Sequence, residues 1–90
     1  MVRTSVKTSW PSRMMQSARA YPDGREWAAE VTIPVTVQVF GKWVHHADVI
    51  VRRRSSTKRL AMMQLHAEVI RIHASKTMSV LEGHEMRVLT

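Results

Sequence analysis

The sequence has 90 residues, with 14 Lys and Arg against seven Asp and Glu, which gives a formal net charge of +7. A chain of this length forms one domain at most and buries only roughly 60% of its unfolded surface, so its own core is marginal. The absence of cysteine excludes disulfides, thiolate metal sites and cysteine nucleophiles, which leaves oligomerisation as the remaining source of stability.

The first 24 residues form a polar, basic segment that we expect to be a flexible arm, followed by one small α+β domain in residues 25–90. The arm has no acid before Asp23, and its basic residues are Arg3, Lys7, Arg13 and Arg19. Pro11 is suited to start a short helix, and Pro22-Asp23-Gly24 predicts a turn. The same composition fits an organellar transit peptide, so an organellar location is the alternative to a cytoplasmic one.

Alternating hydrophobicity predicts a long antiparallel β-hairpin, with strands at about residues 29–40 and 44–53. The apolar positions of the first strand are Val31, Ile33, Val35, Val37 and Val39. Pro34 lacks a backbone N–H, so we expect it to face outward at an edge or to lie at a bulge. Gly41-Lys42 provides the turn, and a second β-branched run follows.

The length of the loop decides which residues of this hairpin face each other. A two-residue loop at Gly41-Lys42 places Val35 opposite Asp48, which mixes apolar and polar side chains on one face. A three-residue loop places Val35 opposite Val49 and keeps the apolar face nearly intact. We therefore predict the second register.

Residues 56–76 are predicted to form one helix that packs on the hairpin. Ser55, Ser56 or Thr57 is suited to cap its N-terminus. An apolar stripe at three- and four-residue spacing predicts the face toward the sheet. Its members are Leu60, Met63, Ala67, Ile70 and Ala74, and it is widened by Met62, Val69 and Ile72. Residues 78–89 are expected either to add short strands or to extend the helix to Leu81.

The main candidate site is the basic cluster at the strand-to-helix junction, where no acid interrupts residues 52–59. Free backbone N–H groups at a helix start favour an anion, and Arg together with hydroxyl groups suits phosphate. The predicted phosphate-binding residues are Arg52, Arg53, Arg54, Ser56, Lys58 and Arg59. A solvent-exposed basic bend without a ligand is the alternative interpretation.

The hairpin tip is a second candidate, because Lys42 and Trp43 combine a cation with an aromatic ring that stacks on unpaired bases. Arg13 and Arg19 of the arm are expected to contribute phosphate contacts. The alternative is that Phe40 and Trp43 fold back into the core.

Catalytic and metal-binding patterns are absent from the sequence, so we expect no enzyme, no cofactor and no metal. His45 and His46 are adjacent in a strand and point to opposite faces. His66 and His73 are seven residues apart, roughly 10 Å along a helix. Neither pair has the spacing of metal ligands.

These features together predict a small, non-enzymatic binding protein that engages nucleic acid, with DNA and RNA both open. The alternative partner is an acidic protein, as for an inhibitor or adaptor such as a phage or plasmid accessory factor, or a small subunit of a larger assembly such as a ribosome. A strand pair followed by a helix with a basic start resembles the end of double-stranded-RNA-binding domains over about forty residues. No third strand is apparent before Pro34, so no membership follows.

Two further expectations concern association. No apolar run approaches the roughly 20 residues that cross a bilayer, so we expect no membrane span. An isolated two-stranded hairpin is marginally stable and has open edges, which predicts a homodimer through strand pairing at the sheet edge.

Overall fold

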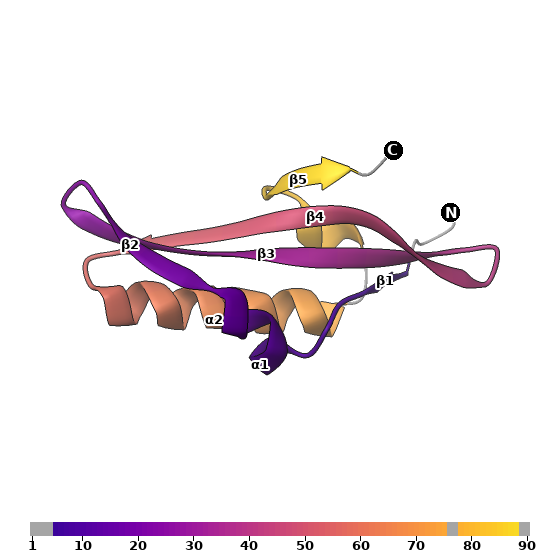
Figure 1. The fold of residues 1–90 in the computed structure, drawn as a ribbon, viewed down its shortest axis with the longest axis horizontal. Coiled ribbons are helices and arrows are strands. Elements are labelled where there is room, and N and C mark those ends of the chain that lie inside the picture. Colours follow the sequence, from indigo (N-terminus) through magenta and orange to yellow (C-terminus); the bar gives the residue numbers. More distant parts are fainter. Residues whose placement is uncertain (1–4, 76–77, 89–90) are drawn as a thin grey trace.

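The computed structural model describes residues 5–75 and 78–88, and its architecture is α+β, as the sequence predicts. One antiparallel sheet is built around a long hairpin, and a single long helix lies along one face of it (Figure 1). The elements are β1 (Val6–Lys7), α1 (Pro11–Met14), η1 (Met15–Ser17), β2 (Arg19–Asp23), β3 (Glu26–Val39), β4 (Lys42–Ser55), α2 (Lys58–Ser75), η2 (Met78–Leu81) and β5 (Glu85–Val88).

The sheet has five strands, and three short ones border the β3–β4 hairpin. β1 pairs with β3 near the hairpin tip, β2 pairs with β3 at the other end, and β5 pairs with β4. The extra strand expected at the C-terminus is therefore present as β5, preceded by a 3-10 turn. Both strands of the hairpin carry partner strands along part of their outer edges, which shortens the free edge that the predicted homodimer needs.

The N-terminal segment differs from the flexible arm that its composition predicts. Val6 and Met14 are each only 5% exposed in the core, and Arg19–Asp23 forms β2. Gly24, with a φ of 64°, supplies the turn that folds β2 back onto β3. Two buried apolar side chains and a strand pairing thus hold a segment whose composition alone suggested disorder, and β2 is the strand that is not apparent before Pro34 in the sequence.

The predicted register of the hairpin is wrong, although its apolar face is right. The turn consists of Phe40 and Gly41, both with positive φ (50° and 79°), so Val39 pairs with Lys42. Between the pairs Thr36–His45 and Val35–Ala47 there is a β-bulge, at which β4 contains one residue more than β3. Beyond this bulge the cross-strand pairs are Val35 with Ala47, Ile33 with Val49 and Val31 with Val51. The bulge restores odd-to-odd pairing, which is why the same side chains still face the core.

The helix is present as predicted, and Thr57 is the residue that caps it: its hydroxyl oxygen accepts a hydrogen bond from the Leu60 backbone N–H at 3.1 Å. The predicted core face of the helix is wrong in its main stripe, although Val69 and Ile72, which were predicted to widen that stripe, are buried. The residues of α2 that are buried against the sheet are Ala61, Leu65, Glu68, Val69 and Ile72. Met63, at 57% exposed, and Ile70, at 47%, face solvent instead.

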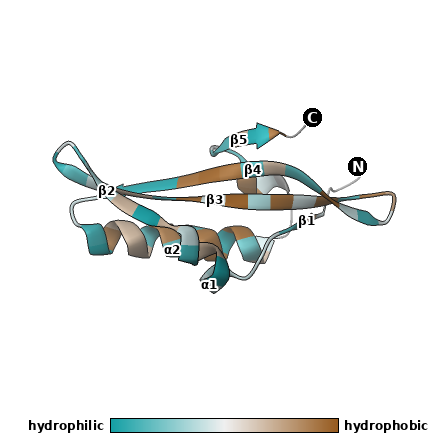
Figure 2. Cartoon of the chain, viewed as in Figure 1, coloured by the Kyte–Doolittle hydropathy of each residue, from teal (hydrophilic) through white to brown (hydrophobic). Residues whose placement is uncertain are grey.

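The apolar side chains of both faces explain that error. Brown, hydrophobic segments recur along α2 as well as along the middle of β3 and β4 (Figure 2). A helix with two apolar sides has no single preferred orientation from periodicity alone. Among the described residues, no helix combines the length and the hydrophobicity that crossing a membrane requires.

Candidate functional site

The three consecutive arginines of the predicted basic cluster, at positions 52–54, lie on alternating faces of β4, and each has an acidic partner. Alternation along the strand directs Arg53 toward α2 and its two neighbours to the other face. The nitrogen-to-oxygen distances are 2.9 Å from Arg52 to Glu30, 2.9 Å from Arg53 to Glu68 and 2.7 Å from Arg54 to Asp23. Each of these three arginines therefore has an acid within reach, although Glu30 and Glu68 are each shared with a second arginine.

Glu30 in β3 accepts hydrogen bonds from two of the residues that were predicted to bind phosphate, Arg19 and Arg52. Arg19 Nε donates to it at 2.9 Å, Arg52 Nε donates to it at 3.0 Å, and the Tyr21 hydroxyl donates to it at 3.3 Å. The hydrogen bond from Arg19 lowers the pKa of Glu30; burial acts to raise it, and the hydrogen bond from Arg52 and the two arginine charges add to the lowering, so the net shift is downward. These arginines hold β2, β3 and β4 together across one face of the sheet.

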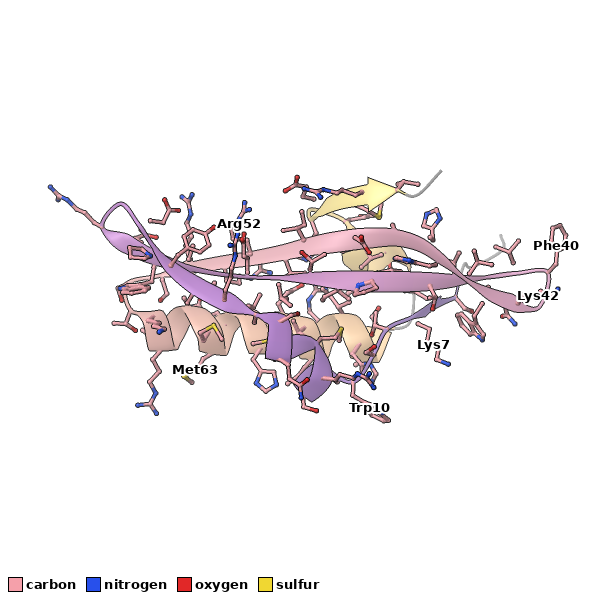
Figure 3. The ribbon with its side chains drawn as sticks, viewed as in Figure 1. Lys7, Trp10, Phe40, Lys42, Arg52 and Met63 are labelled. Atoms are coloured by element: carbon pink, nitrogen blue, oxygen red, sulfur yellow. The ribbon has the colours of Figure 1, made fainter. Side chains whose placement is uncertain are left out.

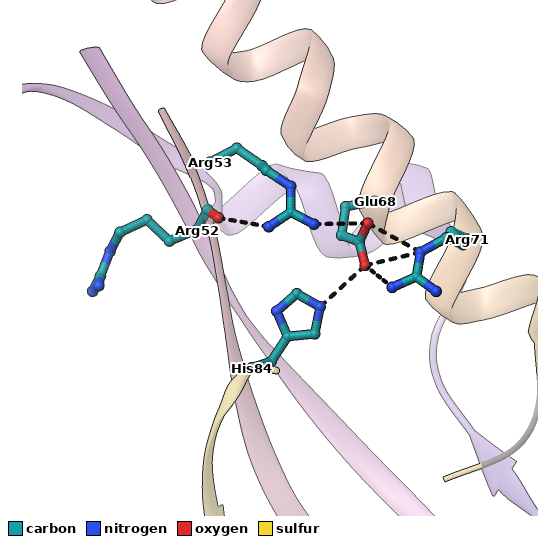
Figure 4. Close-up of polar contacts among 5 residues, drawn as sticks. All are labelled: Arg52, Arg53, Glu68, Arg71 and His84. Atoms are coloured by element: carbon teal, nitrogen blue, oxygen red, sulfur yellow. Dashed lines mark hydrogen bonds and ion pairs between the residues drawn. The ribbon is translucent and has the colours of Figure 1, made fainter. Parts of the chain in front are cut away.

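Glu68 in α2 is the second hub, and its carboxylate is almost enclosed (Figure 4). It accepts hydrogen bonds from Arg71 and, at 3.0 Å, from His84 Nε2, while Arg53 pairs with it across the helix–sheet boundary. Burial acts to raise the pKa of Glu68, but the Arg71 and His84 hydrogen bonds and the two arginine charges lower it to about 2. The cluster ties α2 to β4 and to the loop before β5.

The rest of the predicted cluster lies at the start of α2. Ser56 and Arg59 are exposed, and neither has an ion pair with another described residue. Lys58 Nζ lies 5.9 Å from the centroid of the Trp27 ring. Within the predicted cluster, Lys58 and Arg59 are thus the two cations that have no acidic partner among the described residues.

A hollow of about 450 Å³ lies near the other end of the sheet, beside the hairpin tip. Side chains from β1, β3, β4, α1 and the segment before α1 line it; those that carry its chemistry are Lys7, Trp10, Arg13, Thr36 and Trp43. An adjoining hollow of about 400 Å³ shares three of these residues and adds His73 of α2. We refer to the two together as the tryptophan hollow.

Backbone pairing places the walls of the tryptophan hollow. Lys7 pairs with Thr36, whose hydroxyl donates to the Lys7 carbonyl oxygen at 3.2 Å. Two residue pairs further toward the tip, Gln38 faces Trp43. Pro11 starts α1, and the Trp10 carbonyl oxygen accepts hydrogen bonds from the first turn at 3.0 Å. Segments that lie far apart in the sequence therefore meet at one place.

The aromatic rings of the hollow are open to solvent and lie beside cations. Trp10 is 72% exposed and Trp43 is 45% exposed. The Trp10 ring lies 5.1 Å from the His73 ring, and Lys7 Nζ lies 5.6 Å from the Trp43 ring. The His73 ring also contacts Thr8, whose hydroxyl oxygen lies 3.1 Å from Nδ1. In the described part of the chain, neither Lys7 nor Arg13 forms an ion pair with an acidic residue.

The structure thus brings some predicted site residues together and separates others. Arg13 and Trp43 line the tryptophan hollow, and Lys42 precedes Trp43 at the tip. Figure 3 shows Lys7, Trp10, Phe40 and Lys42 toward one end of a molecule that measures 47 × 24 × 23 Å. Arg52 lies toward the other end.

Sequence reasoning missed Lys7 and Trp10 as site residues. The signal was present in the run Lys7-Thr8-Ser9-Trp10-Pro11-Ser12-Arg13, where a tryptophan stands between two cations in a segment without acids. Basic and aromatic residues interleaved in this way are typical of surfaces that bind single-stranded nucleic acid.

The described residues contain no group of three or more histidines or acids that is arranged to hold a metal ion. His45 Nε2 lies 2.8 Å from Asp48 Oδ1, an isolated pair at the surface. No protein-family model matches the chain, and no curated protein or solved structure is significantly similar to it. The arrangement of the residues themselves therefore has to carry any argument about function.

Proposed function

We propose that this chain is a non-enzymatic binding protein that holds single-stranded nucleic acid in the tryptophan hollow. One observation carries the proposal: two exposed tryptophans and two cations without acidic partners line the same hollow. Stacking of a base on an aromatic ring is worth about 1–3 kcal/mol and tolerates any sequence. Lys7 and Arg13 supply the charge that a phosphate backbone requires.

The geometry favours a single strand over a duplex as the ligand. Stacking on Trp10 or Trp43 requires a base whose face is free, and bases within a duplex are already stacked on each other. The rings come from different parts of the chain, the residue before α1 and strand β4, and the hollow between them offers space for an unpaired base. We therefore expect weaker binding to duplex DNA, through charge alone.

The hairpin tip supports the same proposal. Phe40 is fully exposed, and its φ of 50° lies in the left-handed region that a bulky side chain rarely adopts. A residue that keeps an unfavourable backbone conformation and an exposed ring is typical of a contact site. Phe40 also stands two residues before Lys42, which has no ion pair with a described residue. The tip thus extends the aromatic and basic surface beyond the hollow.

The strand-to-helix junction is a weaker candidate for phosphate binding than its sequence suggests, because its three arginines already pair with acids. A phosphate there competes with the acid that already pairs with each of Arg52, Arg53 and Arg54. Exchanging one ion pair for another yields little net free energy. For this reason the proposal rests on the tryptophan hollow.

Tryptophan fluorescence tests the proposal, because the three tryptophans report on different places. A variant with Trp27→Phe keeps the two rings of the hollow, and a variant with Trp10→Phe and Trp43→Phe keeps only the ring at the far end. We expect a 20-nucleotide oligo(dT) or oligo(U) to quench the first variant and to leave the second unchanged. Quenching of Trp27 alone, or none in either variant, would show that the hollow is not the binding site.

A further inference from the structure

The helix α2 has two apolar sides, and the sheet covers only one of them. On the side away from the sheet, Leu60 is 42% exposed, Met63 is 57% exposed and Ile70 is 47% exposed. Figure 3 shows Met63 on this outer side, and Ala67 and Ala74 are exposed as well. A contiguous apolar strip on the surface of a small soluble domain marks an interaction surface.

The spacing of this strip specifies the shape of its partner. Its five members are Leu60, Met63, Ala67, Ile70 and Ala74, and the steps between them are three, four, three and four residues. This is the repeat of a coiled-coil seam, in which each apolar side chain inserts between residues of a facing helix. The strip extends over about 21 Å of helix at ~1.5 Å per residue, enough for two heptads.

The residues that flank the seam specify the charge of the partner. They are Arg59, His66 and His73 on one side and Gln64 and Arg71 on the other, with no acid among them. Arg71 pairs with Glu68, yet 56% of its side chain remains exposed. Flanking positions of a coiled coil face the flanking positions of the partner helix, and like charges there oppose association.

A second copy of this chain is therefore a poor partner for the seam. In either orientation, a helix pair with itself brings Arg59, His66 and Arg71 toward other basic or neutral flanks. A helix with Glu or Asp at its flanking positions finds opposite charges instead. The apolar seam alone would accept either a second copy of α2 or a helix of another protein, and the basic flanking residues favour the helix with acidic flanks.

We propose that the outer face of α2 binds an amphipathic helix of another protein, with an apolar heptad seam and acidic flanks. None of the five seam residues lines the tryptophan hollow, to which α2 contributes only His73, so this proposal stands whether or not the chain binds nucleic acid. The seam gives the chain a docking function: one side of the molecule engages a helix while the hairpin end stays open.

Synthetic peptides test this surface directly. The probe is a labelled 21-residue helical peptide of three heptads, with Leu at the two seam positions and Glu at the two flanking positions of each heptad. It is titrated with the full chain, and binding is followed by fluorescence anisotropy. A matched peptide has Lys at the flanking positions. We expect the Glu peptide to bind at least tenfold more tightly than the Lys peptide, and this preference to shrink at least threefold in the variant Arg59→Glu with Gln64→Glu.

Two double variants, each of which replaces a pair of exposed apolar residues by Gln, provide the test and its matched control. The variant Met63→Gln with Ile70→Gln should lose at least tenfold in affinity for the Glu peptide, whereas Val39→Gln with Val44→Gln at the hairpin tip should change it less than twofold. Equal binding of both peptides, binding of neither, or unchanged affinity in the α2 variant would overturn the proposal. So would a dimer of the chain in sedimentation equilibrium that the Met63→Gln, Ile70→Gln variant dissociates, because a second copy would then occupy the seam.

Discussion

The Glu68 cluster makes a quantitative prediction about acid stability. The pKa of Glu68 is lowered from 4.5 to about 2 in the folded chain, because the arginine and histidine contacts outweigh burial. A carboxyl group with a lowered folded pKa stabilises the protein above its unfolded pKa and loses that contribution as the pH falls toward the folded pKa. At ~1.36 kcal/mol per pKa unit, Glu68 contributes about 3 kcal/mol at neutral pH.

Replacing the carboxylate by an amide of the same shape isolates this contribution. We expect Glu68→Gln to lower the free energy of unfolding by about 3 kcal/mol at pH 7, since the amide keeps the volume but not the charge that Arg53 and Arg71 face. Between pH 5 and pH 2 the wild-type chain loses the same amount, so the two proteins converge at the acid end of the range. Urea unfolding followed by circular dichroism at each pH measures the difference.

An exposed acid provides the control for that series. Glu82→Gln removes one negative charge from a solvent-exposed position, so it should change the free energy of unfolding by less than about 0.5 kcal/mol at any pH. The reasoning fails if the gap between wild type and Glu68→Gln stays constant from pH 7 to pH 2. It fails equally if the two variants have the same effect at pH 7.

Three further predictions concern stability and use the same unfolding assay. Leu65→Ala should cost about 2–5 kcal/mol because the side chain is fully buried, whereas Leu60→Ala on the outer face should cost less than about 1 kcal/mol; the reverse order would mean that α2 is turned around. Phe40→Asn should stabilise the chain by up to about 1 kcal/mol, since Asn tolerates positive φ in a hairpin turn, and a loss of stability would contradict that turn. Arg53→Gln should cost about 1 kcal/mol and Arg59→Gln almost nothing, because only Arg53 has an acidic partner; equal effects would contradict the pairing.

In the hairpin, the strands could be predicted from the sequence, but the pairing between them could not. Alternation of β-branched residues is a local pattern, so the strands and their buried face were predictable. The pairing was not, because it depends on a turn that places Phe40 at positive φ and on a bulge opposite Val35 and Thr36. Neither feature has a distinct sequence signal, and a bulge shifts every pair beyond it.

The helix and the basic cluster show two other limits. The existence of α2 and its cap at Thr57 follow from local chemistry, but its orientation does not, since both sides are apolar. The clustering of arginines in residues 52–54 was visible, and their partners were not: Glu30 and Glu68 come from other elements and reach them only in the folded chain. The tryptophan hollow is likewise a product of tertiary structure, although its basic and aromatic composition is local.

Two charge-matched variants give the most direct test of the proposed function. One replaces three cations at or beside the tryptophan hollow by Gln, and the other replaces three exposed cations elsewhere that also lack an ion pair with a described residue. The first set is Lys7, Arg13 and Lys42. The second set is Arg25, Arg59 and Arg87. Both variants have the same net charge, so a difference between them reports on location alone.

The measurement is the salt dependence of binding to a labelled 20-nucleotide oligo(dT), followed by fluorescence anisotropy. Each phosphate contact contributes about 0.7 to the slope of log affinity against log salt for a single strand, so losing three contacts should lower the slope by about 2. We predict that loss for the variant at Lys7, Arg13 and Lys42, and a slope close to wild type for the other. Equal slopes in the two variants would contradict binding at the tryptophan hollow and would leave only a general attraction between a basic protein and a polyanion.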